Sequence, residues 1–163
     1  MTVQNNTIRS FEGARMPHGR WRNFAGLQTE YNDRGNRNFT LFLPHEEAQN
    51  MLDEGWNIKW PKPDPEYDDP EEPPMGRLRV TVRFDGKVPP KVQMIQGNLA
   101  TNITEHNAQV LDFAEIINAD VTIRAYCGEV NGKPFVTAYL KTLYATIPAG
   151  DFSEKSAHLE VRD

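Results

Sequence analysis

The chain has 163 residues and a formal net charge of −5, with 38% hydrophobic residues and one cysteine, Cys127. This length suits one compact domain with its own core. A single cysteine excludes an internal disulfide and favours a reducing compartment, and no apolar run is long enough to predict a membrane-spanning helix. The charge is uneven, because residues 44–75 carry −8 while residues 1–43 carry +3 and residues 76–147 carry +2. A domain that is slightly basic outside one acidic segment is compatible with an anionic partner.

The first third of the chain predicts a loose start followed by strands and a helix. Residues 1–19 show no hydrophobic periodicity, and we expect a flexible N-terminal arm there. Residues 20–26 and 36–44 have the composition of strands joined by a polar turn. Residues 45–55 combine helix-forming side chains with a terminal glycine, which predicts a short helix.

An acidic, proline-rich segment follows the next predicted strand. Alternation of Trp56 and Trp60 with polar residues predicts a strand over residues 56–60. Residues 61–74 then hold six of the twelve prolines. Because proline cannot donate to a strand ladder and carboxylates repel one another, we interpret residues 63–75 as an extended, mobile acidic loop within the domain.

The second half of the chain predicts further strands and a long hairpin. Residues 77–84 and 91–96 read as strands, and Thr104 is a candidate N-cap of a short helix. Two alternating runs then meet at Asn131-Gly132. Asn-Gly between such runs is the strongest short-range signal for a two-residue hairpin turn, because both turn positions need a positive φ.

Together these elements predict an all-β domain over residues 20–147 with one or two short helices. A helix before a long closing hairpin favours an OB-fold-like Greek-key β-barrel, where OB denotes oligonucleotide binding. We expect residues 148–163 to form a polar C-terminal tail.

The hairpin separates its side chains into two faces. A two-residue turn at 131–132 pairs residues whose numbers sum to 263, so alternate residues share a face. One face is aliphatic and includes Cys127, which is then an inert core thiol. The other face carries rings and cations: Arg124, Tyr126, Phe135, Tyr139 and Lys141. The expected cross-strand pairs are Arg124 with Tyr139, Tyr126 with Thr137, Thr122 with Lys141, and Gly128 with Phe135, where the glycine leaves room for the ring.

Other candidates extend this surface. Strand 77–84 places three arginines opposite its aliphatic side, and if both strands bury their aliphatic sides in one core, these cations share the outer surface with the hairpin rings. The further candidate binding residues are Arg77, Arg79 and Arg83, with Trp60, Arg22 and Arg37.

Rings beside cations suit single-stranded nucleic acid, because any base can stack on a ring while arginine or lysine contacts phosphate. The plainer alternatives are that the rings pack under a loop or helix and that the arginine row is an ordinary solvated face. Catalysis finds little support. The four histidines lack ligand spacing and no phosphate-binding loop is present, so we expect no enzyme activity, no metal and no cofactor.

Several segments resemble one group of proteins. The segments are "RNFAG", "YNDRGNRNFTLFLP", "EGWNIKW" and "VNGKPFVTAYLKTLYATI", within residues 20–60 and 76–147. Their order is similar to that in phage-encoded single-stranded DNA-binding proteins with an OB fold. The resemblance implies coating of single-stranded DNA during phage replication or recombination, in the cytoplasm of the infected bacterium. The sequence leaves the oligomeric state, monomer or homodimer, open. Many such proteins recruit replication or recombination proteins through an acidic tail. In this chain the acidic internal loop, rather than the tail, could recruit such partner proteins.

Two other classes of function stay open at the level of sequence. The acids of residues 64–72 could mimic DNA and inhibit a host protein, or the chain could be an interaction module without a nucleic-acid role. Titration of labelled oligo-dT against duplex DNA separates the three.

Overall fold

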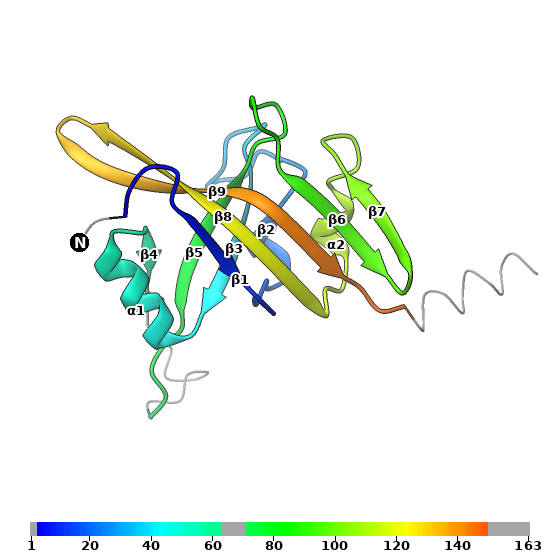
Figure 1. The fold of residues 1–163 in the computed structure, drawn as a ribbon, viewed down its shortest axis with the longest axis horizontal. Coiled ribbons are helices and arrows are strands. Elements are labelled where there is room, and N and C mark those ends of the chain that lie inside the picture. The colour runs from blue at the N-terminus through cyan, green and yellow to red at the C-terminus, as the bar shows by residue number, and fades with distance from the viewer. Residues whose placement is uncertain (1–2, 63–70, 150–163) are drawn as a thin grey trace, which may run out of the picture.

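A computed structural model describes residues 3–62 and 71–149 (Figure 1). The predictions for most of the acidic loop (63–70) and of the tail (150–163) therefore lie outside the described residues. Within the described part, nine strands form a single open sheet whose main path runs β1-β8-β9-β5-β3-β2, which confirms the expected all-β class. The strands are β1 (Ile8–Phe11), β2 (Arg22–Asn23), β3 (Arg37–Leu43), β4 (Ile58–Lys59), β5 (Gly76–Val82), β6 (Lys91–Gln96), β7 (Leu99–Ile103), β8 (Asn118–Val130) and β9 (Lys133–Thr146). The helices are the 3-10 turn η1 (Gly19–Trp21), α1 (His45–Glu54) and α2 (Val110–Phe113).

The long β8–β9 hairpin organises the sheet, and its turn end projects from the body of the molecule (Figure 1). Asn131 and Gly132 have φ values of 53° and 79°, as the predicted turn requires. β9 is central because it pairs with β8 along its length, with β5 near Ala138, and with β6 from Thr142 onward.

A β-bulge interrupts the hairpin. The predicted pairs hold from the turn as far as Ile123, which lies opposite Leu140, but Thr122 pairs with Thr142. The prediction that Thr122 lies opposite Lys141 is therefore wrong. The extra residue, Lys141, shifts the alternation of β9 by one position. Along β9 the buried residues are therefore even-numbered up to Leu140 and odd-numbered from Leu143.

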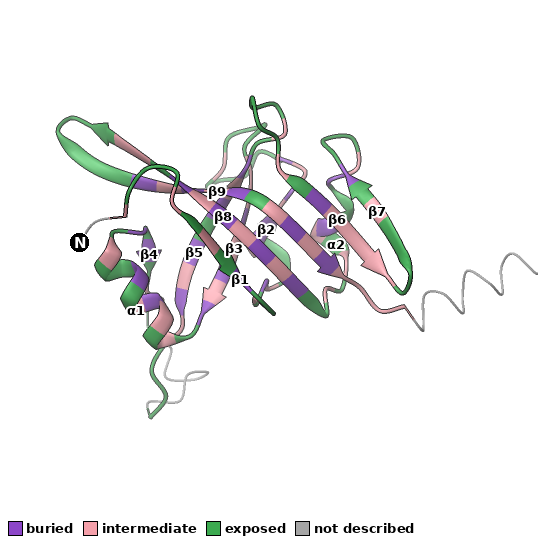
Figure 2. Cartoon of the chain, viewed as in Figure 1, coloured by how far each residue is buried: buried purple, intermediate pink, exposed green. Residues whose placement is uncertain are grey.

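The core lies on one side of the sheet, and buried positions alternate with more exposed ones along β5, β8 and β9 (Figure 2). Its largest fully buried side chains include Trp56, Phe24 and Phe39, and the last two rings stack at 5.1 Å. α1 covers one end and ends at Gly55, whose φ of 105° is the left-handed conformation that glycine adopts readily. The predicted helix 45–55 is thus confirmed.

The N-terminal segment differs from its expectation. Within the described residues 3–19 the chain is not a loose arm, because β1 pairs with β8 and both Phe11 and Met16 are buried in the core. Upstream, Asn5 accepts a hydrogen bond from the Cys127 amide at 3.1 Å. Three further elements differ from prediction: the strand 20–26 shrinks to β2, the helix from Thr104 to the four residues of α2, and β7 was not predicted.

Candidate nucleic-acid interface

The side of the sheet opposite the core, here called the outer face, carries most of the predicted binding residues. One row of outward residues crosses five neighbouring strands through the Cα pairs Asn38–Thr81, Thr81–Tyr139, Tyr139–Arg124 and Arg124–Ile8. The buried neighbours Val80 and Ala138 also pair with each other, so β5 and β9 do turn the same side outward. The expectation that the hairpin rings and the β5 arginines share one surface is met.

Four residues of the hairpin form what we call the hairpin cluster: Arg124, Tyr126, Phe135 and Tyr139. The Tyr126 ring centroid lies 6.4 Å from that of Phe135 and 6.0 Å from that of Tyr139, and the Arg124 guanidinium lies 5.8 Å from the Tyr139 centroid. Tyr126 is 44% exposed and Phe135 is 39% exposed. The described residues therefore leave large ring surfaces open to a ligand.

Gly128 makes room for one of these rings. A Cβ placed on Gly128 would lie 2.9 Å from Cε1 and 3.0 Å from Cε2 of Phe135, and closer still to Cζ. The Phe135 ring thus lies across the glycine backbone, as predicted from the hairpin register. Only a residue without a side chain lets the ring occupy this position.

The cations near the hairpin cluster are held differently. Arg124 donates a hydrogen bond to Asn6 Oδ1 at 3.0 Å, so the N-terminal segment orients it. Lys141 is exposed at the bulge, beyond Tyr139 on β9. On β5, Arg79 is exposed, whereas Arg83, directly after the strand, forms an ion pair with Asp85 at 3.8 Å.

Arg22, a candidate DNA-binding residue from the sequence, is buried within the protein. It is 6% exposed, and its guanidinium donates hydrogen bonds to the carbonyl oxygens of Met16 at 2.6 Å, Ala114 at 2.7 Å and Leu111 at 3.3 Å. Burial lowers the pKa of Arg22, and the charge of Asp112 opposes that shift. The side chain joins three chain segments inside the protein, which is a structural role.

Two other candidates have structural partners. Arg37 donates hydrogen bonds to the carbonyl oxygens of Phe24 and Glu105, so much of its donor capacity is used within the protein. Trp60 is partly buried against the core, with its ring 4.9 Å from that of His45. The structure does not bring either residue into the hairpin cluster.

A second group of rings and arginines lies on the outer face, and the sequence analysis missed it. We call it the edge cluster: Arg15, Arg20, Trp21, Phe42 and Arg77. The rings of Trp21 and Phe42 meet edge to face at 5.1 Å. Alternation along β3 is a sequence signal that could have identified Phe42 as outward, but Trp21 and Arg15 reach it only through tertiary contacts.

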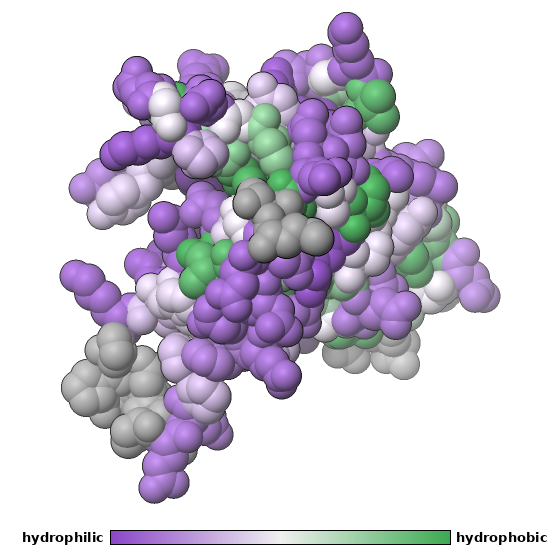
Figure 3. Space-filling view, turned by 60° about the vertical axis from the view of Figure 1, so that its left-hand side comes forward, coloured by the Kyte–Doolittle hydropathy of each residue, from purple (hydrophilic) through white to green (hydrophobic). Residues whose placement is uncertain are grey.

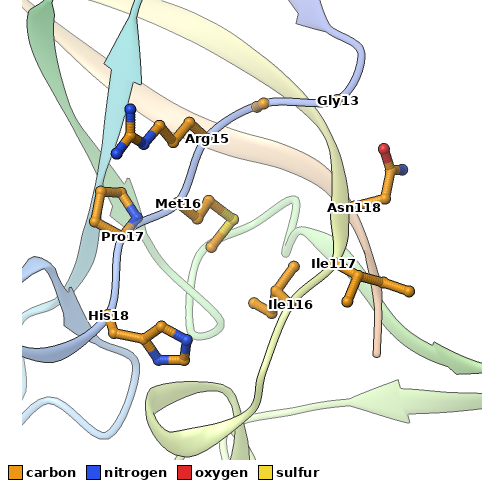
Figure 4. Close-up of a pocket in the computed structure, with 9 residues that line it drawn as sticks. Gly13, Arg15, Met16, Pro17, His18, Ile116, Ile117 and Asn118 are labelled. Atoms are coloured by element: carbon orange, nitrogen blue, oxygen red, sulfur yellow. The ribbon is translucent and has the colours of Figure 1, made fainter. Parts of the chain in front are cut away.

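In the part of the chain that the structure describes, the remaining surface and one pocket can be compared with these clusters. In Figure 3 polar side chains dominate the visible face, and hydrophobic patches are small and separated. One pocket lies between Gly13–His18 and Ile116–Asn118 (Figure 4). Across residues 3–62 and 71–149, no group of three His, Cys, Asp or Glu side chains could hold a metal ion. No helix in the same ranges is long and apolar enough to cross a membrane.

Comparison with known proteins places this geometry in context. A family model described as "Putative phage ssDNA-binding domain" matches residues 3–163. A search of curated protein sequences found no match. Among solved structures, the single-stranded DNA-binding protein of bacteriophage Enc34 is similar in three forms.

The complex of the Enc34 protein with ssDNA has a TM-score of 0.53 and 13% identity, and the match covers 90% of this chain and 93% of that one. The protein alone gives 0.51 and 14%, covering 89% and 86%, and its C-terminal truncation gives 0.52 and 14%, covering 86% and 85%. At this identity the likeness shows the fold, which is consistent with the predicted OB-like architecture. Because the family model spans almost the whole sequence, the chain belongs to the phage single-stranded DNA-binding domain family.

Proposed function

We propose that the outer face of the sheet binds single-stranded DNA without strong sequence preference, and that the protein coats such strands during phage replication or recombination. The observation that carries the proposal is the hairpin cluster, in which three partly exposed rings and an arginine form a chain whose successive members lie 5.8–6.4 Å apart. Family membership supports the same function.

The chemistry of the hairpin cluster favours single strands over duplex. Every base has a π-face, so stacking on Tyr126, Phe135 or Tyr139 tolerates any sequence and contributes about 1–3 kcal/mol per base. In a duplex these faces are covered by neighbouring base pairs and become accessible only at an unstacking cost of a few kcal/mol. Arg124 and Lys141 stand beside the rings, where they can contact phosphates.

The net charge of −5 does not oppose this role. A binding strand meets the local field of the outer face, where Arg79, Arg124 and Lys141 are presented, and charges more than about 10 Å away are largely screened at 0.1 M salt. The described acidic residues Glu71 and Glu72 are exposed and precede β5. We therefore propose that the cations of the outer face, rather than the net charge of the chain, govern the contact with a strand.

The direct test is a fluorescence titration with a labelled oligo-dT of about 16 nucleotides, the upper site size of one OB fold, and with a duplex of equal length. We expect clear preference for the single strand, similar affinity for mixed-sequence strands, and affinity that falls as salt rises. Tyr126→Ala should weaken binding, whereas the matched control Tyr31→Ala, at an exposed loop position outside the cluster, should not. Equal affinity for duplex and single strand, or no binding at low salt, would refute the proposal.

A further inference from the structure

The edge cluster stacks three arginines on two rings. The guanidinium carbons of Arg20 and Arg77 lie 4.5 Å and 4.6 Å from the Trp21 centroid. Those of Arg77 and Arg15 lie 5.2 Å and 5.9 Å from the Phe42 centroid. The cluster is assembled from β3, β5, η1 and the segment after β1, so its geometry is fixed by the fold.

A guanidinium that stacks on a ring uses its face and leaves its N–H donors, which point outward in the plane, able to bind an anion. Arg15 and Arg20 are both exposed, and neither forms an ion pair with a residue of the described ranges. Arg15 donates to Met75 Sδ at 3.3 Å, but a thioether is a weak acceptor. In Figure 4 the Arg15 guanidinium points away from Ile116 and Ile117, out of the pocket. Two oriented cations thus face solvent.

The edge cluster lies on the same outer face as the hairpin cluster, and β5 connects them. Arg77 belongs to the edge cluster, and Thr81, four residues later, pairs with Tyr139. At about 3.3 Å per residue the two positions are about 13 Å apart. The exposed Arg79 lies between them on the same side. Arg79 therefore places a positive charge between the edge cluster and the hairpin cluster.

We propose that the edge cluster is a second contact site for the same DNA strand, in which Arg15 and Arg20 bind phosphates while bases stack on the hairpin cluster. The inference rests on the proposed function, because it assigns a path to the strand that the hairpin cluster binds. The ligand class is the phosphodiester backbone of single-stranded DNA. A strand bound at both sites crosses β9, β5 and β3 over Arg79.

The test compares the double variant Arg15→Gln/Arg20→Gln with the wild type and with Arg9→Gln. Arg9 is a suitable control because it pairs with Glu47 and Glu54 at 3.7 Å, beside α1. Binding is measured as a function of salt for oligo-dT of about 4 and about 16 nucleotides, the limits of an OB-fold site. Each lost phosphate contact reduces the slope of log K against log salt by about 0.7 for single strands. We therefore expect the double variant to lower the slope by about 1.4 for the long strand and to leave the short strand unchanged.

Thermal melting verifies that each variant is folded, and Arg20→Gln alone, with an expected slope change of about 0.7, replaces the double variant if that one is unstable. The proposal of a second site is overturned if the double variant has the wild-type slope of log K against log salt for the long strand. It is also overturned if the double variant lowers that slope only as much as Arg9→Gln does. In both cases the proposed function stands if the wild type still prefers single strands. Equal loss of slope on duplex and on single strands also overturns the inference, since it indicates a general attraction to phosphate.

Discussion

Gly128 offers a direct test of whether the Phe135 ring is a platform for a base. In Gly128→Ala the new methyl would lie within 3.0 Å of Cε1 and Cε2 of Phe135, so the ring must move. Gly128 does not have a positive φ, and alanine therefore fits the backbone. The ring is 39% exposed near the free end of the hairpin and has room to turn away.

The stability effect of this substitution should be small. Alanine in place of glycine in a strand interior is favourable by about 0.5–1 kcal/mol. Loss of the contact between Phe135 and Tyr126 costs about 0.5–1.5 kcal/mol. The two terms nearly cancel, and a net change of 1 kcal/mol shifts Tm by about 2–4 °C in a protein of this size. Binding should lose one stacked base, about 1–3 kcal/mol or roughly 5- to 150-fold in Kd.

The assay pairs thermal melting with oligo-dT titration for three variants. Phe135→Ala sets the loss expected when the ring is absent. Gly86→Ala is the matched control, because a Cβ there meets only a backbone oxygen at 3.8 Å and the φ is ordinary. If Gly128→Ala binds like the wild type while Phe135→Ala binds weakly, the position of the ring across Gly128 is not the one that receives the base, and the reasoning fails.

Two further predictions separate binding from folding. Tyr139→Ala should weaken oligo-dT binding by about 1–3 kcal/mol with little change in melting temperature. Leu140→Ala, at a buried position, should instead lower the free energy of unfolding by about 2–5 kcal/mol. The opposite pattern would show that the two faces of the hairpin are inverted. Arg22→Met should destabilise by about 3 kcal/mol, because three carbonyl oxygens lose a charged donor. Titration below its melting temperature should give wild-type affinity, and weaker binding by the folded variant would return Arg22 to the interface.

The elements that sequence predicted well are those whose determinants are local. Asn131-Gly132 fixes the hairpin turn within two residues, and the turn in turn fixes the pairs Arg124–Tyr139 and Gly128–Phe135. The bulge escaped prediction because alternation on either side of Lys141 is regular, and only the change from even to odd buried positions records the extra residue.

The misassigned parts depend on distant partners. β1 is four residues long and becomes a strand because the edge of β8 is available to pair with it. Arg22 precedes the buried Phe24 by two residues, a signal that alternation already contained, but its acceptors at Met16, Leu111 and Ala114 could not be foreseen. The edge cluster escaped for the same reason, since Arg15 and Trp21 meet only after folding.

The bulge at Lys141 joins the fold to its proposed function. Before it, β9 pairs with β5 and turns Tyr139 outward; after it, β9 pairs with β6 and buries Leu143. Without the extra residue, β9 would keep one alternation throughout. Leu143 would then face outward, on the same side as Tyr139, and would not reach the core. The bulge lets one strand bury aliphatic side chains along both halves and still present a ring followed by an exposed lysine. That order, ring then cation along a single strand, suits the proposed contacts with a base and a neighbouring phosphate.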